Sequence, residues 1–138
     1  MAFDIMAIPF PDQSFDIALC NHVLEHVEDD RVAMGELLRV LKPNGFLYSH
    51  HPIDLQMERT VEDATVTNPA ERIRLFGQRD HVRRYRRDFT DRLEEAGFRV
   101  EIERYTPPSL RSVAFYGLRE EEPIFVCRRP LEDSRQVR

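Results

Sequence analysis

Histidines and a glutamate gather where a predicted strand gives way to a loop. His22, Glu25 and His26 spell H-x-x-E-H, the inverzincin pattern of metal-dependent hydrolases. On a helix, this i, i+3, i+4 spacing would place the three side chains on one face, as a metal ion requires. The alternative is that Glu25 and His26 order the start of a helix. We expect this structural role, with metal binding and a hydrolase as the alternatives.

Two further histidines, His50 and His51, follow a short apolar strand predicted over Phe46–Ser49. A histidine pKa near neutrality suits a general base acting on a hydroxyl or an amine. Adjacent residues of a strand point to opposite faces, so at most one of the two can face a site. We predict His51 or His50 as the catalytic base, and the alternative is a packed or exposed residue.

The elements that must position these residues form a βαβ unit. A continuous apolar run in the strand Phe15–Cys20 favours a strand covered on both faces. A helix is predicted over residues 30–41, with Asp29 and Asp30 as caps. Gly45 is expected to supply the positive φ that ends it. Parallel sheets of this kind bind ligands beyond the carboxyl ends of their strands.

The rest of the chain predicts an insertion and the end of the same sheet. Residues 54–87 lack a clean period and predict short helical pieces and loop. A helix over residues 89–96 is expected to be capped by Asp88 and stopped by Gly97. Alternation over residues 98–103 predicts an edge strand, and a last apolar strand follows at residues 124–127.

A dense arginine cluster lies in the second half of the insertion. Guanidinium groups pair well with carboxylate or phosphate, so the cluster could hold an acidic substrate. The alternative is a solvated helix face that Asp80 and Asp88 partly neutralise. The cluster comprises Arg79, Arg83, Arg84, Arg86 and Arg87, together with His81 and Tyr85.

Composition excludes several classes of protein. The 138 residues and 41% hydrophobic content suit one domain with one core. A formal charge of −5 argues against general nucleic-acid binding. No apolar stretch approaches the roughly 20 residues of a membrane span, and no signal peptide is visible, so a cytoplasmic location is expected. Cys20 and Cys127 lie in apolar runs, which predicts buried free thiols.

Several motifs together carry a family resemblance over roughly residues 4–130. The combination resembles the class I S-adenosylmethionine (SAM) dependent methyltransferases of the type 11 kind. The resemblance implies SAM as cofactor, a small-molecule methyl acceptor, and strands four to seven of a doubly wound, Rossmann-like α/β sheet whose last strand is antiparallel. The motifs are Asp4-Ile5, Pro9-Phe-Pro-Asp-Gln-Ser-Phe-Asp16, Val23-Leu-Glu-His26, Leu41-Lys-Pro-Asn-Gly45 and Glu94-Glu-Ala-Gly-Phe98.

The resemblance also implies positions for cofactor binding. It places Asp4 and Ile5 at the adenine ring, and Asn21 and His22 near the methionine portion of SAM. The alternatives are a frayed N-terminal segment for Asp4 and a helix cap for Asn21. Some ubiquinone-pathway and small-RNA methyltransferases carry a metal-binding E-x-x-E-H at this point, and here His22 replaces its first glutamate.

The cofactor's glycine-rich turn is the feature that the sequence lacks. The five glycines stand at positions 35, 45, 77, 97 and 117, so no two have the G-x-G spacing. We therefore expect the C-terminal portion of a methyltransferase domain over residues 1–130, with 54–87 a substrate-side insertion and 131–138 a flexible tail. Weak or absent SAM binding is expected of such a chain, and an exposed sheet edge favours a homodimer. A non-catalytic, self-associating module is the alternative function.

Overall fold

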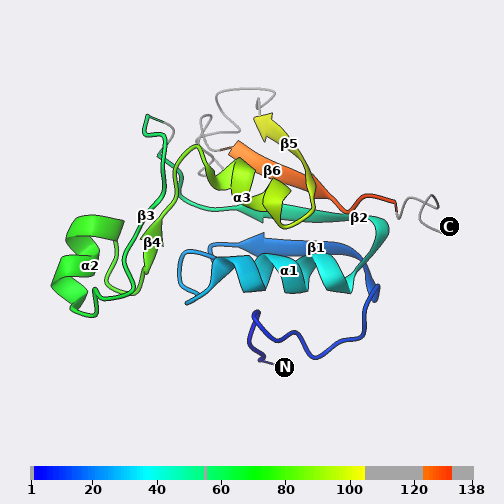
Figure 1. Cartoon of the computed structure of the whole chain (residues 1–138), viewed down its shortest axis with the longest axis horizontal. Helices are drawn as coiled ribbons and strands as arrows, with labels where there is room; N and C mark the ends of the chain where they lie inside the picture. The colour runs from blue at the N-terminus through cyan, green and yellow to red at the C-terminus, as the bar shows by residue number, and fades with distance from the viewer. Residues whose placement is uncertain (1, 55, 105–122, 132–138) are drawn as a thin grey trace, which may run out of the picture.

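The computed structural model describes residues 2–54, 56–104 and 123–131, and its centre is a four-stranded sheet (Figure 1). The strand order is β1-β2-β6-β5. β1 (Phe15–Asn21) and β2 (Leu41–His50) are parallel, whereas β6 (Pro123–Arg128) is antiparallel to both β2 and β5 (Arg99–Arg104). The predicted fold class is confirmed, as are the antiparallel last strand and the edge position of β5 within this sheet.

Two helices cover one face of the sheet. α1 (Asp30–Val40) begins at Asp29, whose carboxylate accepts hydrogen bonds from the backbone N–H groups of the first turn, as predicted. α3 (Phe89–Glu95) ends before Gly97, which has φ +109°. The core lies between these helices and the inward side chains of the strands. It includes Met34, Leu37, Phe89 and Leu93 from the helices and Cys20, Leu47, Phe125 and Cys127 from the strands.

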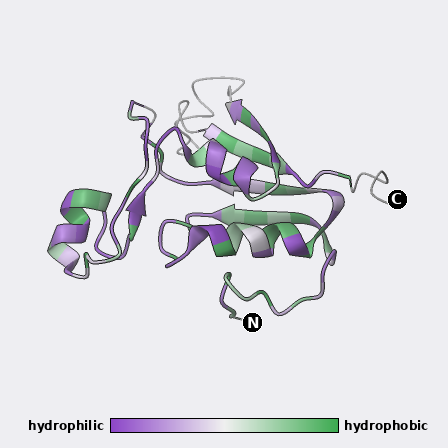
Figure 2. Ribbon diagram, in the orientation of Figure 1, coloured by the Kyte–Doolittle hydropathy of each residue, from purple (hydrophilic) through white to green (hydrophobic). Residues whose placement is uncertain are grey.

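The opposite face of β1 is exposed in this chain. Ile17 is 57% exposed and Leu19 is 72% exposed. Their partners on β2, Phe46 and Tyr48, are half-buried on the same face. Figure 2 shows hydrophobic residues along β1. The prediction that β1 is covered on both faces is therefore wrong for the chain as it stands.

The turn from α1 into β2 differs from the prediction in one residue. Asn44, not Gly45, has positive φ, at +66°. Asparagine tolerates this region because its short polar side chain bonds locally. Gly45 is needed for a different reason: a Cβ atom there would lie 2.9 Å from the Lys42 carbonyl oxygen and 3.0 Å from that of Asp16. The glycine lets two backbone segments approach each other.

Residues 54–87 fold into a small unit beside the sheet (Figure 1). α2 (Pro69–Phe76) is capped by Asn68 and ends at Gly77, which has φ +95°. β3 (Val61–Glu62) and β4 (Arg83–Arg84) pair antiparallel in a second sheet that the sequence did not predict. The predicted tail over 131–138 lies outside the described residues from position 132 onward.

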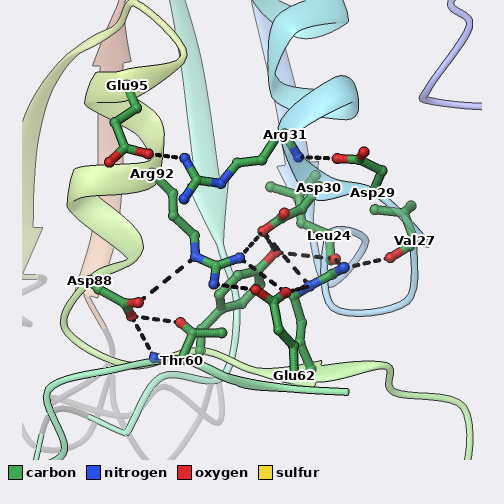
Figure 3. Close-up of polar contacts among 12 residues, drawn as sticks. Leu24, Val27, Asp29, Asp30, Arg31, Thr60, Glu62, Asp88, Arg92 and Glu95 are labelled. Atoms are coloured by element: carbon green, nitrogen blue, oxygen red, sulfur yellow. Dashed lines mark hydrogen bonds and ion pairs between the residues drawn. The ribbon is translucent and has the colours of Figure 1, made fainter. Parts of the chain in front are cut away.

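Five side chains, four of them buried, form a polar network that joins this unit to the sheet domain (Figure 3). The Asp30 carboxylate accepts hydrogen bonds from the Tyr85 hydroxyl at 2.8 Å and from Arg92 Nη1 at 3.0 Å. Glu62 accepts from Arg92 Nη2 at 2.7 Å and from Arg83 Nε at 3.1 Å. We call these five residues the Asp30 network. Burial raises the pKa of Tyr85, and the neighbouring Asp30 carboxylate raises it further.

Arg83 also fastens the loop that follows β1. Its guanidinium donates to the backbone carbonyls of Leu24 at 2.7 Å and Glu28 at 2.9 Å. Arg83 and Arg86 are buried, and Arg86 Nη1 lies 2.6 Å from Asp54. The prediction of a solvated helix face is therefore wrong for these two arginines, because Arg83 lies on strand β4, Arg86 follows that strand, and both side chains form internal ion pairs.

Asp88 occupies the residue before α3 without capping it. The structure shows no hydrogen bond from the helix to its side chain. Its Oδ1 instead accepts from the backbone N–H of Thr60 at 2.8 Å and from the Thr60 hydroxyl at 2.6 Å. The predicted cap is wrong because a contact from the preceding unit competes for the same carboxylate.

Gly45→Ala should destabilise the fold by about 1–3 kcal/mol, since the added methyl group meets backbone atoms that cannot rotate away. Gly35→Ala is the matched control. No atom lies within 4 Å of the Cβ position at Gly35 in α1, so this change should stabilise by about 0.5–1 kcal/mol. Urea unfolding followed by circular dichroism measures both. If the two substitutions changed the free energy of unfolding by the same amount, the close approach at Gly45 would be contradicted.

Asp30→Asn should destabilise by about 3 kcal/mol, because removing the charge leaves the buried Arg92 and Arg83 with Glu62, which is exposed, as the one carboxylate that both contact. Asp16→Asn breaks an exposed pair with Lys42 at 2.8 Å and should cost less than about 1 kcal/mol. The same unfolding measurement compares the two variants. A similar loss in both would show that the network contributes no more than a surface ion pair.

Candidate functional site

The carboxyl ends of β1 and β2 bring three of the predicted site residues together. Asn21 pairs with His50 in the register of the two strands. The backbone N–H of His22 donates to the His50 carbonyl at 2.9 Å, and the two imidazole rings lie 5.0 Å apart at nearly a right angle. Asn21, His22 and His50 thus share one rim of the sheet, where ligands bind in folds of this type.

The H-x-x-E-H segment is a series of turns and not the start of a helix. His22 has φ +52°, and α1 begins only at Asp30. His22 Nδ1 still lies 3.4 Å from Glu25 Oε1. His26 faces away toward the insertion, where its Nδ1 lies 3.5 Å from Asp80. The expectation that Glu25 and His26 order the start of a helix is therefore wrong, because the backbone there follows turn geometry. For the same reason the helix face on which the metal alternative depended does not form.

His51 lies in the core, 1% exposed, among the rings of Tyr85, Phe89 and Phe125. Its Nε2 lies 2.9 Å from the Ser49 hydroxyl. Burial lowers the pKa of His51 despite the nearby Glu25 carboxylate, so the imidazole is neutral at pH 7. A general base must reach the acceptor, and of the two predicted histidines the half-buried His50 at the rim satisfies this condition better.

Glu25 is an unusual carboxylate for so buried a position. It is 2% exposed, and neither side-chain oxygen has a hydrogen-bond partner among the described residues. Its other near neighbour is His51 Nδ1, 3.7 Å from Oε2. Burial raises the pKa of Glu25, but the His51 and His26 imidazoles lower it to below its ordinary value. The side chain is therefore an anion without a committed partner.

The segment that carries Asp4 and Ile5 precedes β1 and is fastened to α1. The Asp4 carboxylate accepts a hydrogen bond from the backbone N–H of Met6 at 2.8 Å and is exposed. Four residues on, the backbone N–H of Ile8 donates to Glu36 of α1 at 2.8 Å. Ile5 is half-buried against the core. The adenine-binding role of both residues stays a prediction.

The described residues fit one side of a SAM site. The Asn21 amide offers both donors and acceptors, and the His22 backbone turns sharply at the strand end, so polar groups can approach a charged ligand there. The sequence supplies no G-x-G turn to hold the opposite side. The role of Asn21 and His22 at the methionine end stays a prediction, as does that of Asp4 and Ile5 at the adenine ring.

The two cysteines play no part at this rim. Both are buried free thiols, as predicted. Burial raises the pKa of Cys20 and of Cys127 to about 12, so neither is a thiolate at neutral pH.

The sequence missed two residues that the fold brings to Glu25 and its neighbours. Ser49 holds His51, and only its position two residues earlier on the same strand hinted at this contact. His81, whose ring lies 4.7 Å from that of His26, comes from the loop between α2 and β4. No local pattern could relate residues 55 positions apart.

A cavity of about 360 Å³ lies elsewhere, beside α3, and is lined by charged side chains of both signs. Three arginines face four carboxylates, so the cavity is no preformed site for an anion. Its lining residues are Arg31, Glu58, Arg59, Asp88, Asp91, Arg92 and Glu95.

None of the helices in the described part of the chain has the length and apolar character of a membrane span.

Comparison with known proteins gives one family. The model of the methyltransferase domain family matches residues 1–49. The chain is 31% identical over 130 residues to 27-O-demethylrifamycin SV methyltransferase of Amycolatopsis mediterranei. This alignment covers 86% of this chain and 44% of that protein. It is 32% identical over 97 residues to malonyl-[acyl-carrier protein] O-methyltransferase of Halorhodospira halophila, covering 69% of this chain and 30% of the relative.

Solved structures agree on the fold. An S-adenosylmethionine-dependent methyltransferase from Mesorhizobium loti superposes with a TM-score of 0.59 at 21% identity, over 92% of this chain and 67% of that one. The chain spans less than half the length of the two curated relatives named above. The fold, the family model and the relatives agree: this chain belongs to the class I SAM-dependent methyltransferases.

Proposed function

We propose that the protein carrying this sequence transfers a methyl group from SAM to an oxygen atom of a small molecule. One observation supports oxygen as the acceptor atom. Two relatives whose similarity extends well beyond the first 49 residues, over 86% and 69% of this chain, are both named for O-methylation. These alignments reach into the insertion, the part of the chain that we assign to the acceptor.

The residues at the rim of the sheet, Asn21, His22 and His50, have different roles in such a transfer. SAM supplies a methyl group bound to a positively charged sulfur. Asn21 and His22 hold the methionine end of the cofactor, and His50 accepts the proton of the acceptor hydroxyl. Displacement at carbon depends mainly on holding the reactants in line, so rigid placement of the rim matters more than acid-base strength. Arg83 supports that placement through its bonds to the Leu24 and Glu28 carbonyls.

The acceptor's charge is a separate question. Of the five clustered arginines, Arg83 and Arg86 are committed to buried ion pairs. Arg84 is half-exposed, with Nη2 3.5 Å from Asp54. An acidic acceptor therefore stays a prediction that rests on Arg79 and Arg84, and a cytoplasmic location stays a prediction from composition.

Co-expression with a segment that carries a G-x-G turn, taken from a related methyltransferase, tests the function. The chain alone should bind SAM weakly or not at all, and the complex should bind it with a gain of at least about 100-fold, because the second side of the site is then present. Isothermal titration calorimetry measures the affinity. Transfer of a labelled methyl group to a panel of hydroxylated small molecules measures the activity.

Two variants separate the proposed roles. His50→Gln should lower kcat by about 100-fold and leave SAM affinity unchanged, as expected for a base. Glu94→Gln, on the exposed side of α3, is the control and should change neither. If the segment associates and SAM still does not bind, Asn21 and His22 are wrongly assigned. Unchanged kcat in His50→Gln would remove His50 from the reaction.

We further propose that this chain forms a homodimer through β1. In the described sheet β1 pairs with β2 on one side only, so its other edge presents backbone N–H and C=O groups. Such an edge favours pairing with another strand, and the exposed Ile17 and Leu19 beside it add apolar surface. A second copy offers the same edge, which permits a two-fold arrangement.

Light scattering at tens of micromolar should report a dimer for the wild-type chain. Ile17→Lys should shift it to monomer, because a charge at this position opposes apolar contact across the edge. Ile73→Lys is the matched control, since Ile73 on α2 is 54% exposed, close to the 57% of Ile17. A stable wild-type monomer, or equal dissociation by both variants, would overturn the proposed interface.

A further inference from the structure

An unsatisfied buried anion marks a second candidate site, on the insertion side of Glu25. Removing a carboxylate from water carries a penalty of several kcal/mol unless a partner compensates it. Both oxygens of Glu25 lack a hydrogen-bond partner among the described residues, whereas the buried Asp30 carboxylate accepts two hydrogen bonds through Oδ2. Such exceptions call for a ligand that the protein atoms do not supply.

Two imidazoles lie beside this anion and complete a set of ligands. Glu25, His26 and His81 each offer one ligand atom, and the three atoms lie within 4.8 Å of one another. Glu25 and His81 are buried, and His26 is half-buried with its side chain 33% exposed. Glu25 and His81 are therefore held inside the protein, and an ion could enter the cluster from the solvent side, at His26.

Both histidines contact an oxygen atom outside the cluster through Nδ1, which leaves Nε2 as the nitrogen to bind an ion. His81 Nδ1 lies 3.2 Å from the Phe76 carbonyl, and a proton donated there leaves the lone pair on Nε2. His26 Nδ1 lies 3.5 Å from the Asp80 carboxylate, an ion-pair distance at which the negative charge favours a proton on the same ring nitrogen. Metal-binding histidines commonly show this arrangement, with the second nitrogen donating to a carboxylate or a backbone carbonyl.

The scaffold holds the two contributing segments together without an ion. The backbone N–H of Val82, next to His81, donates to the Glu25 carbonyl at 3.0 Å. Arg83 donates to the Leu24 carbonyl on the other side of Glu25. Ligand atoms around tetrahedral zinc lie about 3.4 Å apart for bonds near 2.1 Å, so from separations within 4.8 Å the side chains need to close by at most about 1.4 Å.

We propose that Glu25, His26 and His81 bind a divalent transition-metal ion of the Zn²⁺ class. Two imidazoles and one carboxylate suit Zn²⁺ far better than Mg²⁺ or Ca²⁺, which prefer oxygen ligands. This set differs from the H-x-x-E-H set of the sequence. His22 lies on the opposite side of Glu25, near Oε1 and His50, and His81 takes its place. The ion would join the loop after β1 to the insertion.

Metal titration of the purified 138-residue chain tests this site. Zn²⁺ binding is measured by calorimetry, and the visible absorption of Co²⁺ in its place reports a tetrahedral site. We expect one ion per chain and a rise in melting temperature that EDTA reverses, because the ion binds the folded state. His81→Gln and Glu25→Gln should each weaken Zn²⁺ binding by at least about 100-fold and abolish the Co²⁺ spectrum.

His22→Gln and His50→Gln are the matched controls, since both remove a neighbouring imidazole outside the proposed set. Binding should persist within about threefold in each. Loss of binding in His22→Gln with retention in His81→Gln would overturn the proposal in favour of the H-x-x-E-H set. The absence of stoichiometric binding by the wild-type chain would overturn it outright. Circular dichroism of each metal-free variant confirms that any loss does not come from unfolding.

Discussion

One buried carboxylate, Asp30, links the parts of this molecule. It begins α1, where the helix dipole favours a negative charge, and it receives Arg92 from α3 and Tyr85 from the strand side of the insertion. Through Glu62, the same cations reach β3. Tyr85 also packs in the apolar core against Phe89 of α3, so apolar contact and directional polar bonds together join the insertion to the helices. The same group of residues also holds the rim of the sheet in place, because Arg83 donates a hydrogen bond to the loop after β1.

The sequence predicted those features that depend on neighbours in the chain. Asp29 caps α1 and Gly97 stops α3 because each role needs only local backbone geometry. The four strands of the main sheet follow from apolar runs and alternation in the same way. The sequence could not show that Asn44 has the positive φ and that Gly45 lies in the close backbone contact, since both residues tolerate positive φ. The backbone of Asp16, which forms part of that contact, lies 29 positions before Gly45. Asp88 was misjudged for a related reason, because Thr60 binds its carboxylate.

Charge in a sequence proved a poor guide to exposure. A run of arginines between residues 79 and 87 suggested either a substrate grip or a solvated face, yet Arg83 is buried and satisfied by Glu62 and backbone carbonyls. The partners come from 21 to 59 residues away, so no window of sequence could reveal them. On β1 the apolar residues gave the opposite error. Ile17 and Leu19 predict a buried face, but both are exposed in this chain. The type of a residue shows which kind of contact would stabilise it when buried. Whether that contact forms depends on segments that are distant in the sequence.

Glu25 and Asp30 show what that distinction means for function. They stand five residues apart, both almost completely buried, on the same turn-and-helix segment. Asp30 has an arginine and a tyrosine hydroxyl within 3.0 Å, and removing its charge would leave cations without compensation. Glu25 has only imidazoles at 3.4 Å and 3.7 Å, and these distances are too long for good hydrogen bonds. A carboxylate kept in this state weakens the fold unless something else binds it. The first carboxylate therefore accounts for the architecture, whereas the second is the basis of the metal site that we propose where the insertion meets the rim of the sheet.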